Sequence, residues 1–138
     1  MDDIALMREI GRLQEQINAL RTIEVGGVWT AWTPTITAAT GTLTTVSATG
    51  YYSKIAKVVA IQLVITITTN GTGGVAIIST LPINNNLVTI ITGRETNTTG
   101  KILQGLVNSN RIDIYNYDNS YPGADGYAFY MTGIYSIA

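Results

Sequence analysis

The chain has 138 residues, and only 12% of them are charged, about half of the ~25% that is usual in soluble domains. The net charge is −1 and the eight Lys and Arg residues are scattered, which argues against a nucleic-acid-binding surface. Cysteine and histidine are both missing, which excludes disulfides, thiolate metal sites and the commonest general base. So little charge also predicts that part of the surface is covered in an oligomer.

Charge divides the chain into two unequal parts. Residues 1–24 carry eight charged side chains, whereas the remaining 114 residues carry nine. From residue 29 onward the composition becomes rich in Thr, Ile, Val and Gly, which favours β-strands. We therefore predict an oligomerisation stem over residues 1–25 and a β knob over residues 26–138.

A heptad repeat predicts that residues 3–24 form an amphipathic helix. Apolar residues recur at spacings of 4, 3, 4 and 3, with isoleucine at position a and leucine at position d. They are Leu6, Ile10, Leu13, Ile17 and Leu20. Asp2 and Asp3 suit the helix N-terminus, and Gly26-Gly27 suits its end.

A helix of this length, roughly 33 Å, is marginal in water by itself, so it must pack on something. We expect it to pack on copies of itself through the five heptad residues, and packing on its own domain is the alternative. Isoleucine at a with leucine at d favours two strands in parallel coiled coils, whereas a tightly trimeric knob would impose three. The stem alone leaves dimer and trimer open.

The knob begins a series of short strands separated by turn residues. Residues 59–67 alternate between fully apolar positions and mixed ones, which predicts a long strand with one face on the core. Asn70-Gly71 follows as a turn. The other predicted strands are 30–37, 43–47, 51–55, 75–80, 87–92, 101–107, 111–117 and 127–135, with a turn assigned to Thr49-Gly50 between the second and third of these.

Eight or nine short antiparallel strands predict a β-sandwich, and a jelly-roll-like sandwich is the preferred form because it suits closed trimers. An immunoglobulin-like sandwich fits the same pattern. The predicted fold class is thus mainly β, with an N-terminal coiled-coil stem and a trimeric antiparallel sandwich knob. The sequence leaves the strand order unresolved.

Several segments of the knob resemble small virion proteins of tailed bacteriophages, of the fibre and receptor-binding type. They are WTPT at 32–35, GYYSKIAKVV at 50–59, Leu81-Pro82 and the closing segment 129–135 with Gly133. The resemblance covers most of residues 29–138 and fits the preceding stem. It implies a trimeric β knob on a short stem, displayed on a virion. The family often has glycine where Ala56 stands here, which affects the local turn and not the fold.

The densest cluster of aromatic and polar residues lies at 113–127, with four of the eight tyrosines and three of the five aspartates. Tyrosine rings stack on sugars, Asp and Asn bind hydroxyl groups, and aromatic residues also favour protein interfaces. We expect a ligand-binding site here, and the alternative is a Tyr-rich strand and ordinary turn packed within the knob or between subunits. The predicted ligand-binding residues are Tyr115, Asn116, Tyr117, Asp118, Asn119, Tyr121 and Asp125.

The chain contains no motif typical of a catalytic site or a metal site. An oxygen-ligated calcium site from Asp118, Asn119 and Asp125 does not match the spacing of an EF-hand loop. The remaining carboxylates of the knob, Glu95 and Asp113, lie in no arrangement typical of glycoside cleavage. We therefore expect no enzymatic activity, no metal and no cofactor.

The N-terminus lacks an apolar run of signal-peptide length, and the longest apolar stretch is far below the ~20 residues that span a bilayer. With the resemblance, this predicts a protein made in the host cytoplasm, without membrane insertion, that joins other virion proteins as a homotrimer. The expected function is adhesion to a host surface receptor, with a glycan as the favoured class and a protein as the other. The alternative is a head fibre or a capsid or tail decoration protein with a structural role.

Overall fold

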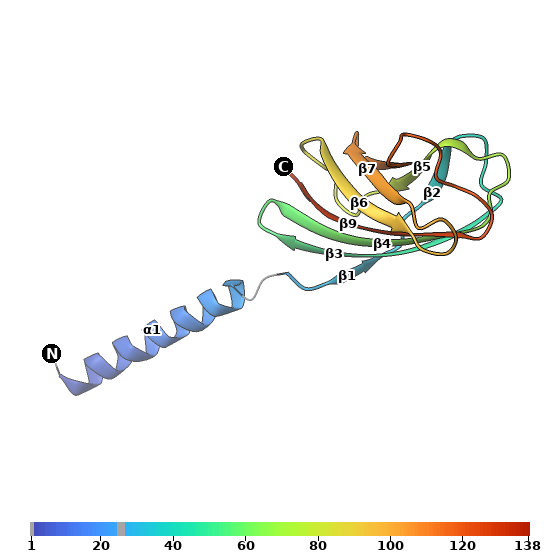
Figure 1. Cartoon of the computed structure of the whole chain (residues 1–138). Helices are drawn as coiled ribbons and strands as arrows, with labels where there is room; N and C mark the ends of the chain where they lie inside the picture. The colour runs from blue at the N-terminus through green and yellow to red at the C-terminus, as the bar shows by residue number, and fades with distance from the viewer. Residues whose placement is uncertain (1, 25–26) are drawn as a thin grey trace.

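The computed structural model describes residues 2–24 and 27–138, in which one helix precedes nine β-strands (Figure 1). This confirms a mainly β fold with an N-terminal helix. The predicted helix end at Gly26-Gly27 falls partly on residue 26, outside the described residues. The elements are α1 (Asp3–Glu24), β1 (Thr30–Trp32), β2 (Ile36–Thr40), β3 (Thr45–Ile55), β4 (Val58–Thr69), β5 (Gly74–Thr80), β6 (Thr89–Glu95), β7 (Ile102–Asn108), β8 (Arg111–Asn116) and β9 (Tyr127–Ser136).

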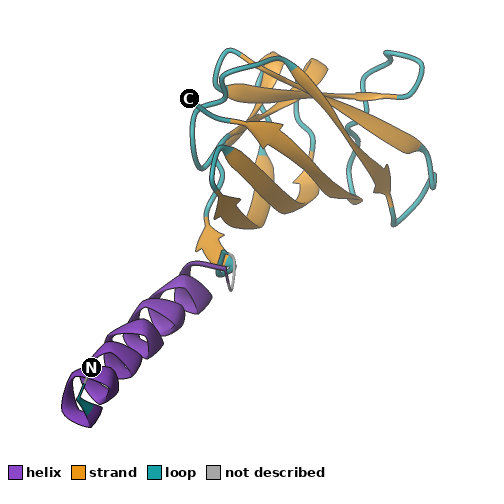
Figure 2. Cartoon of the chain, turned by 90° about the vertical axis from the view of Figure 1, so that its left-hand side faces the viewer, coloured by secondary structure: helices purple, strands orange, loops and turns teal. Residues whose placement is uncertain are grey.

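Helix α1 begins where the sequence predicts. The Ala5 backbone N–H donates to the Asp2 carboxylate at 2.7 Å, which caps the first turn. Asp3 adds a second negative charge in that turn, where the helix dipole favours it. Figures 1 and 2 show α1 projecting away from the sheet.

All nine strands belong to one antiparallel sheet in the order β1-β3-β4-β9-β6-β7-β8-β5-β2. Strand β2, at one edge of the sheet, contacts β3, the second strand from the opposite edge. The sheet therefore curls around its own inner face. In Figure 1, β3, β4 and β9 lie beneath β7, β5 and β2. The structure therefore shows a curled antiparallel sheet, and the finer assignment to a jelly-roll-like or immunoglobulin-like sandwich stays a prediction.

The inner face of the curled sheet holds the hydrophobic core. Strand β4 supplies Ile61, Leu63, Ile65 and Ile67, each at most 1% exposed, which confirms the alternation predicted for this segment. Phe129 of β9 is completely buried against them. Since side chains on a strand alternate between faces, the residues between these positions point outward.

The predicted strand 30–37 is wrong, because the chain changes place in the sheet at Pro34. Strand β1 pairs with β3, whereas β2 pairs with β5 at the other end of the order. Proline has no N–H to donate to a ladder and fits a break between strands. Pro34 is buried at this crossing. The two short strands help to close the curl.

The predicted turn at Thr49-Gly50 is also wrong, because β3 runs without interruption from Thr45 to Ile55. Gly50 pairs with Leu63 of β4 on one side and with Trp32 of β1 on the other. A Cβ at Gly50 would lie 2.2 Å from Cε3 of the Trp32 indole. The glycine therefore makes room for a ring and does not mark a turn.

The hairpin between β3 and β4 turns through Ala56-Lys57, with Ile55 paired to Val58. Ala56 has φ +51°, in the left-handed region that a Cβ disfavours by roughly 1–2 kcal/mol. The hairpin forms here in spite of the alanine.

Candidate functional site

The Tyr-rich segment lies on β8 and in the long loop that leads to β9. Tyr115 is partly buried on β8, and Tyr117, directly after the strand, is 64% exposed. The Tyr117 backbone N–H donates to the Ile102 carbonyl of β7 at 3.0 Å, which holds this residue at the end of the sheet. Tyr117 thus presents its ring to solvent from a fixed backbone.

Asn116 organises the tight turn after β8. Its side chain is 6% exposed, and its Nδ2 donates to Ser120 Oγ at 2.9 Å and to the Tyr121 carbonyl at 3.1 Å. Its backbone N–H donates to the Ser120 carbonyl at 3.0 Å. The hydrogen bonds of this buried amide go to residues of its own loop, so Asn116 has a structural role.

The polar side chains of that turn are also bonded within the chain. The Asp118 carboxylate accepts bonds from the Ser120 hydroxyl and backbone N–H, and these lower the pKa of Asp118. Asn119 stands at φ +66°, and its Oδ1 accepts from Gln104 Nε2 at 2.7 Å. Asparagine tolerates this left-handed backbone better than most residues.

The rest of the loop is fastened to the turn between β4 and β5. The Tyr121 hydroxyl donates to Asn70 Oδ1 at 2.6 Å, and burial of the ring raises the pKa of Tyr121. The Asp125 carboxylate accepts from the Asn70 backbone N–H at 2.7 Å. Two residues predicted to bind a ligand therefore hold two distant loops together through Asn70.

The structure thus divides the seven predicted ligand-binding residues into two groups. Five have side-chain hydrogen bonds within the chain: Asn116, Asp118, Asn119, Tyr121 and Asp125. Tyr115 and Tyr117 contribute aromatic surface, and Tyr117 is the more exposed of the two. Within residues 2–24 and 27–138, no three His, Cys, Asp or Glu side chains gather in one place.

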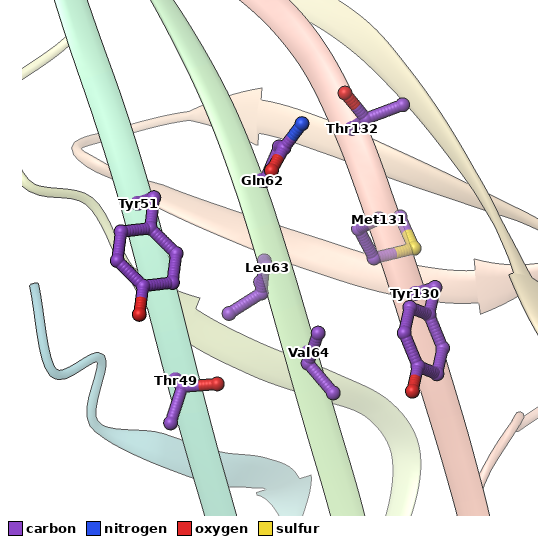
Figure 3. A pocket seen from close by; sticks show the side chains of 8 residues that line it. All are labelled: Thr49, Tyr51, Gln62, Leu63, Val64, Tyr130, Met131 and Thr132. Carbon is purple, nitrogen blue, oxygen red and sulfur yellow. The ribbon is translucent and has the colours of Figure 1, made fainter. Parts of the chain in front are cut away.

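A groove of about 400 Å³ lies on the outward side of β3, β4 and β9. Tyr51 and Tyr130 stand on either side of Gln62 and Val64, with Thr132 beside them (Figure 3). Tyr51 is paired with Gln62, and Val64 with Tyr130, so two neighbouring rows of the sheet build the groove. Two half-exposed rings around an amide suit stacking or interface contacts. Sequence reasoning missed this site, because only the strand register brings the two tyrosines together.

Glu95 is a second feature that sequence reasoning missed. The residue is 1% exposed at the end of β6, and its carboxylate accepts backbone N–H bonds from residues 97, 98, 99, 100 and 128. Burial by itself raises the pKa, but the bonds from Thr99, Thr98, Asn97 and Ala128 outweigh it and lower the pKa of Glu95 to about 2. The carboxylate thereby closes the loop between β6 and β7. The sequence offers no signal for this role beyond a lone acid followed by turn-forming residues.

The five heptad residues of α1 share one exposed stripe. Leu6, Ile10, Leu13, Ile17 and Leu20 are between 46% and 58% exposed. On the neighbouring helix surface, Arg12 forms an ion pair with Glu9. The predicted apolar seam therefore exists as a surface that no part of the described chain buries.

No helix in the described part of the chain is long and apolar enough to cross a membrane. No protein-family model, curated protein or solved structure matches this chain.

Proposed function

We propose that the protein is a bacteriophage virion component, a homotrimeric fibre or spike whose β knob binds a host cell-surface receptor, with a glycan as the favoured class. The observation that carries this proposal is the uncovered heptad seam of α1, joined to a β domain of low charge. A 22-residue helix with such a seam is marginal by itself, and copies of the same helix are its simplest partner. The proposed assembly is a short coiled-coil stem with three knobs.

Within this assembly, we assign receptor contact to Tyr117, with Tyr115 beside it. The Tyr117 ring is the most exposed aromatic group of the predicted site, and Asn116 and Asn119 brace the turn that follows it. An aromatic ring on a braced backbone can stack on a sugar at little entropic cost. Three copies acting together would raise a weak affinity by ~10²–10⁴.

The proposed role of the stem in assembly is tested by measuring the mass of the particle that the chain forms in solution. Ile17→Asp places a charge in the seam of every copy, and an unpaired buried charge is costly. Light scattering is expected to show a smaller particle for this variant than for the natural chain. Ala19→Asp puts the same charge on the helix surface away from the seam and serves as the control. An unchanged mass for Ile17→Asp means that the stem does not hold the assembly together.

The location and the receptor site need separate tests. Antibody labelling of intact particles, viewed by electron microscopy, is expected to place the protein on the virion, and absence of label on any particle contradicts the proposal. Tyr117→Ala is expected to weaken binding to host cells at least tenfold without lowering the melting temperature. Wild-type binding by this variant would remove Tyr117 from the receptor site.

A structural role on the head or tail is the second candidate. It is favoured by the internal hydrogen bonds of five predicted ligand-binding side chains, which leave fewer polar groups for a receptor. A decoration protein of this kind predicts particles that are fragile without it yet adsorb to the host normally. Receptor binding predicts the reverse: intact particles that adsorb poorly.

A further inference from the structure

The outward surface of four neighbouring strands is almost free of charge and carries several exposed large apolar side chains. Within β3, β4, β9 and β6, all fully described, Arg94 is the only charged residue on the outward side. Six large outward side chains are between 44% and 61% exposed: Tyr51, Ile55, Val58, Ile90, Tyr130 and Ile134. We call this surface the outer β3-β4-β9-β6 face.

The loop before β6 extends the same surface. Leu87 and Val88 are 62% and 61% exposed and line a shallow depression together with Val58 and Ile134. At about 100 Å² for each half-exposed large side chain, these eight residues present on the order of 800 Å² of surface. The largest apolar patch of an ordinary monomer is about 300–600 Å², whereas one side of a stable protein interface is about 800 Å². The outer face has the size of an interface.

The stem enters the knob on this same face. A Cβ built on Gly27 would lie 2.2 Å from Oγ of Ser53, so the chain that follows the stem runs over the Ser53 side chain. Ser53 is paired with Ala60, and Ala60 with Ile134, so all three stand in one outward row. Copies that associate through α1 would therefore bring their outer faces close to one another.

We propose that the outer β3-β4-β9-β6 face packs against a second copy of this chain, which deepens the proposed function by naming the knob surface that assembles. Its near neutrality offers nothing to a partner of opposite charge, and its apolar area gains most from burial against another apolar area. The groove between Tyr51 and Tyr130 then receives side chains of the neighbouring knob. Tyr117, beyond the end of β8, remains open to a receptor.

The absence of cysteine makes this proposal directly testable. Single-cysteine variants of the full chain, Ile134→Cys and Tyr117→Cys, place a thiol at sites of nearly equal exposure in one copy, 61% and 64%. Maleimide labelling of the Ile134→Cys thiol is expected to be at least tenfold slower than that of the Tyr117→Cys thiol. Dilution below the assembly concentration is expected to make the two rates equal.

A second pair of variants tests the energetics of the face. Ile134→Glu is expected to shift dissociation, followed by light scattering, to at least tenfold higher protein concentration, whereas Tyr117→Glu leaves it unchanged. Both positions are exposed in one copy, so neither variant is expected to disturb folding, which the melting temperature checks.

Each other outcome overturns the proposal in a recognisable way. An oligomer in which both thiols react at equal rates means that copies meet through the stem alone, and the proposed fibre survives. Protection of the Ile134→Cys thiol that dilution does not relieve means that a second copy is not what covers it. A chain that stays monomeric at all concentrations removes both the face and the trimeric assembly. Receptor binding at Tyr117 is measured separately on cells.

Discussion

Replacing Glu95 by glutamine tests whether a single buried carboxylate holds the loop between β6 and β7. Oε2 accepts N–H bonds from Thr98, Thr99 and Gly100, and Oε1 accepts from Asn97, Thr98 and Ala128. Glutamine has the same shape but turns one of these two acceptors into an N–H₂ donor. Whichever way the amide faces, backbone donors then meet a donor, and the charge that strengthens all the bonds is lost.

The pKa of Glu95 provides the magnitude. A fall from 4.5 to about 2 corresponds to ~3.4 kcal/mol of stabilisation by the ionised form at ~1.36 kcal/mol per unit. The carboxylate lies under one surface loop, where water screens it, so we take about half of this figure. We expect Glu95→Gln to lower the free energy of unfolding by about 2 kcal/mol at pH 7, and the melting temperature by about 8 °C.

The assay is urea unfolding followed by circular dichroism at several pH values. Because the folded-state pKa is depressed, the stabilisation is fully present above pH 4.5 and is lost as the pH falls toward 2. The difference between the natural chain and Glu95→Gln should therefore shrink to about a quarter at pH 2.5. Glu15→Gln, an exposed site on α1, is the control and should change little.

Two results would refute this reasoning. A Glu95→Gln variant whose unfolding free energy at pH 7 lies within 0.5 kcal/mol of the natural value means that the bonds contribute little. A difference that stays constant from pH 7 to pH 2.5 means that the charge of Glu95 is not the cause.

Two predictions concern positions at which the backbone favours or requires glycine. Ala56→Gly removes the left-handed strain at φ +51° but adds chain entropy to the unfolded state, so we expect a net gain of about 0.5–1 kcal/mol, read from the melting temperature. Gly50→Ala drives a Cβ into the Trp32 ring and should cost about 2–3 kcal/mol, measured by urea unfolding. In a Trp32→Ala background the same change should cost less than 1 kcal/mol, and a cost that stays the same would contradict the steric explanation.

Periodic patterns in the sequence predicted the elements whose structure is local. The heptad spacing from Leu6 to Leu20 predicted helix α1, and Asp2 and Asp3 predicted its start, because a helix forms its hydrogen bonds within one segment. The alternation along β4 likewise predicted its buried face. Both patterns show which side chains share one face of an element, and the order of residues along that element determines this face.

The predictions failed where the role of a residue depends on a neighbour that is distant in the sequence. Gly50 reads as a turn in the sequence, and only its position beside Trp32 explains why glycine is needed within a strand. The predicted strand 30–37 ran through Pro34, because nothing local shows that the chain crosses to β5 there.

The candidate site also has a part that the sequence predicted and a part that only the structure shows. Composition identified the Tyr-rich segment, yet the pairing of Tyr121 and Asp125 with Asn70 shows that these side chains hold the fold together. Such bonds join residues more than fifty positions apart, and a hydrogen bond between them has no periodic trace in the sequence.

The order of side chains by itself therefore determined a heptad helix, a β domain and the buried face of its long strand. Strand order, the groove between Tyr51 and Tyr130, the outer apolar face and the enclosed Glu95 carboxylate all came from the three-dimensional arrangement. The physical reason is that periodicity reflects burial along one element. Contacts across a curled sheet depend instead on which backbone groups and side chains become neighbours once the sheet has closed.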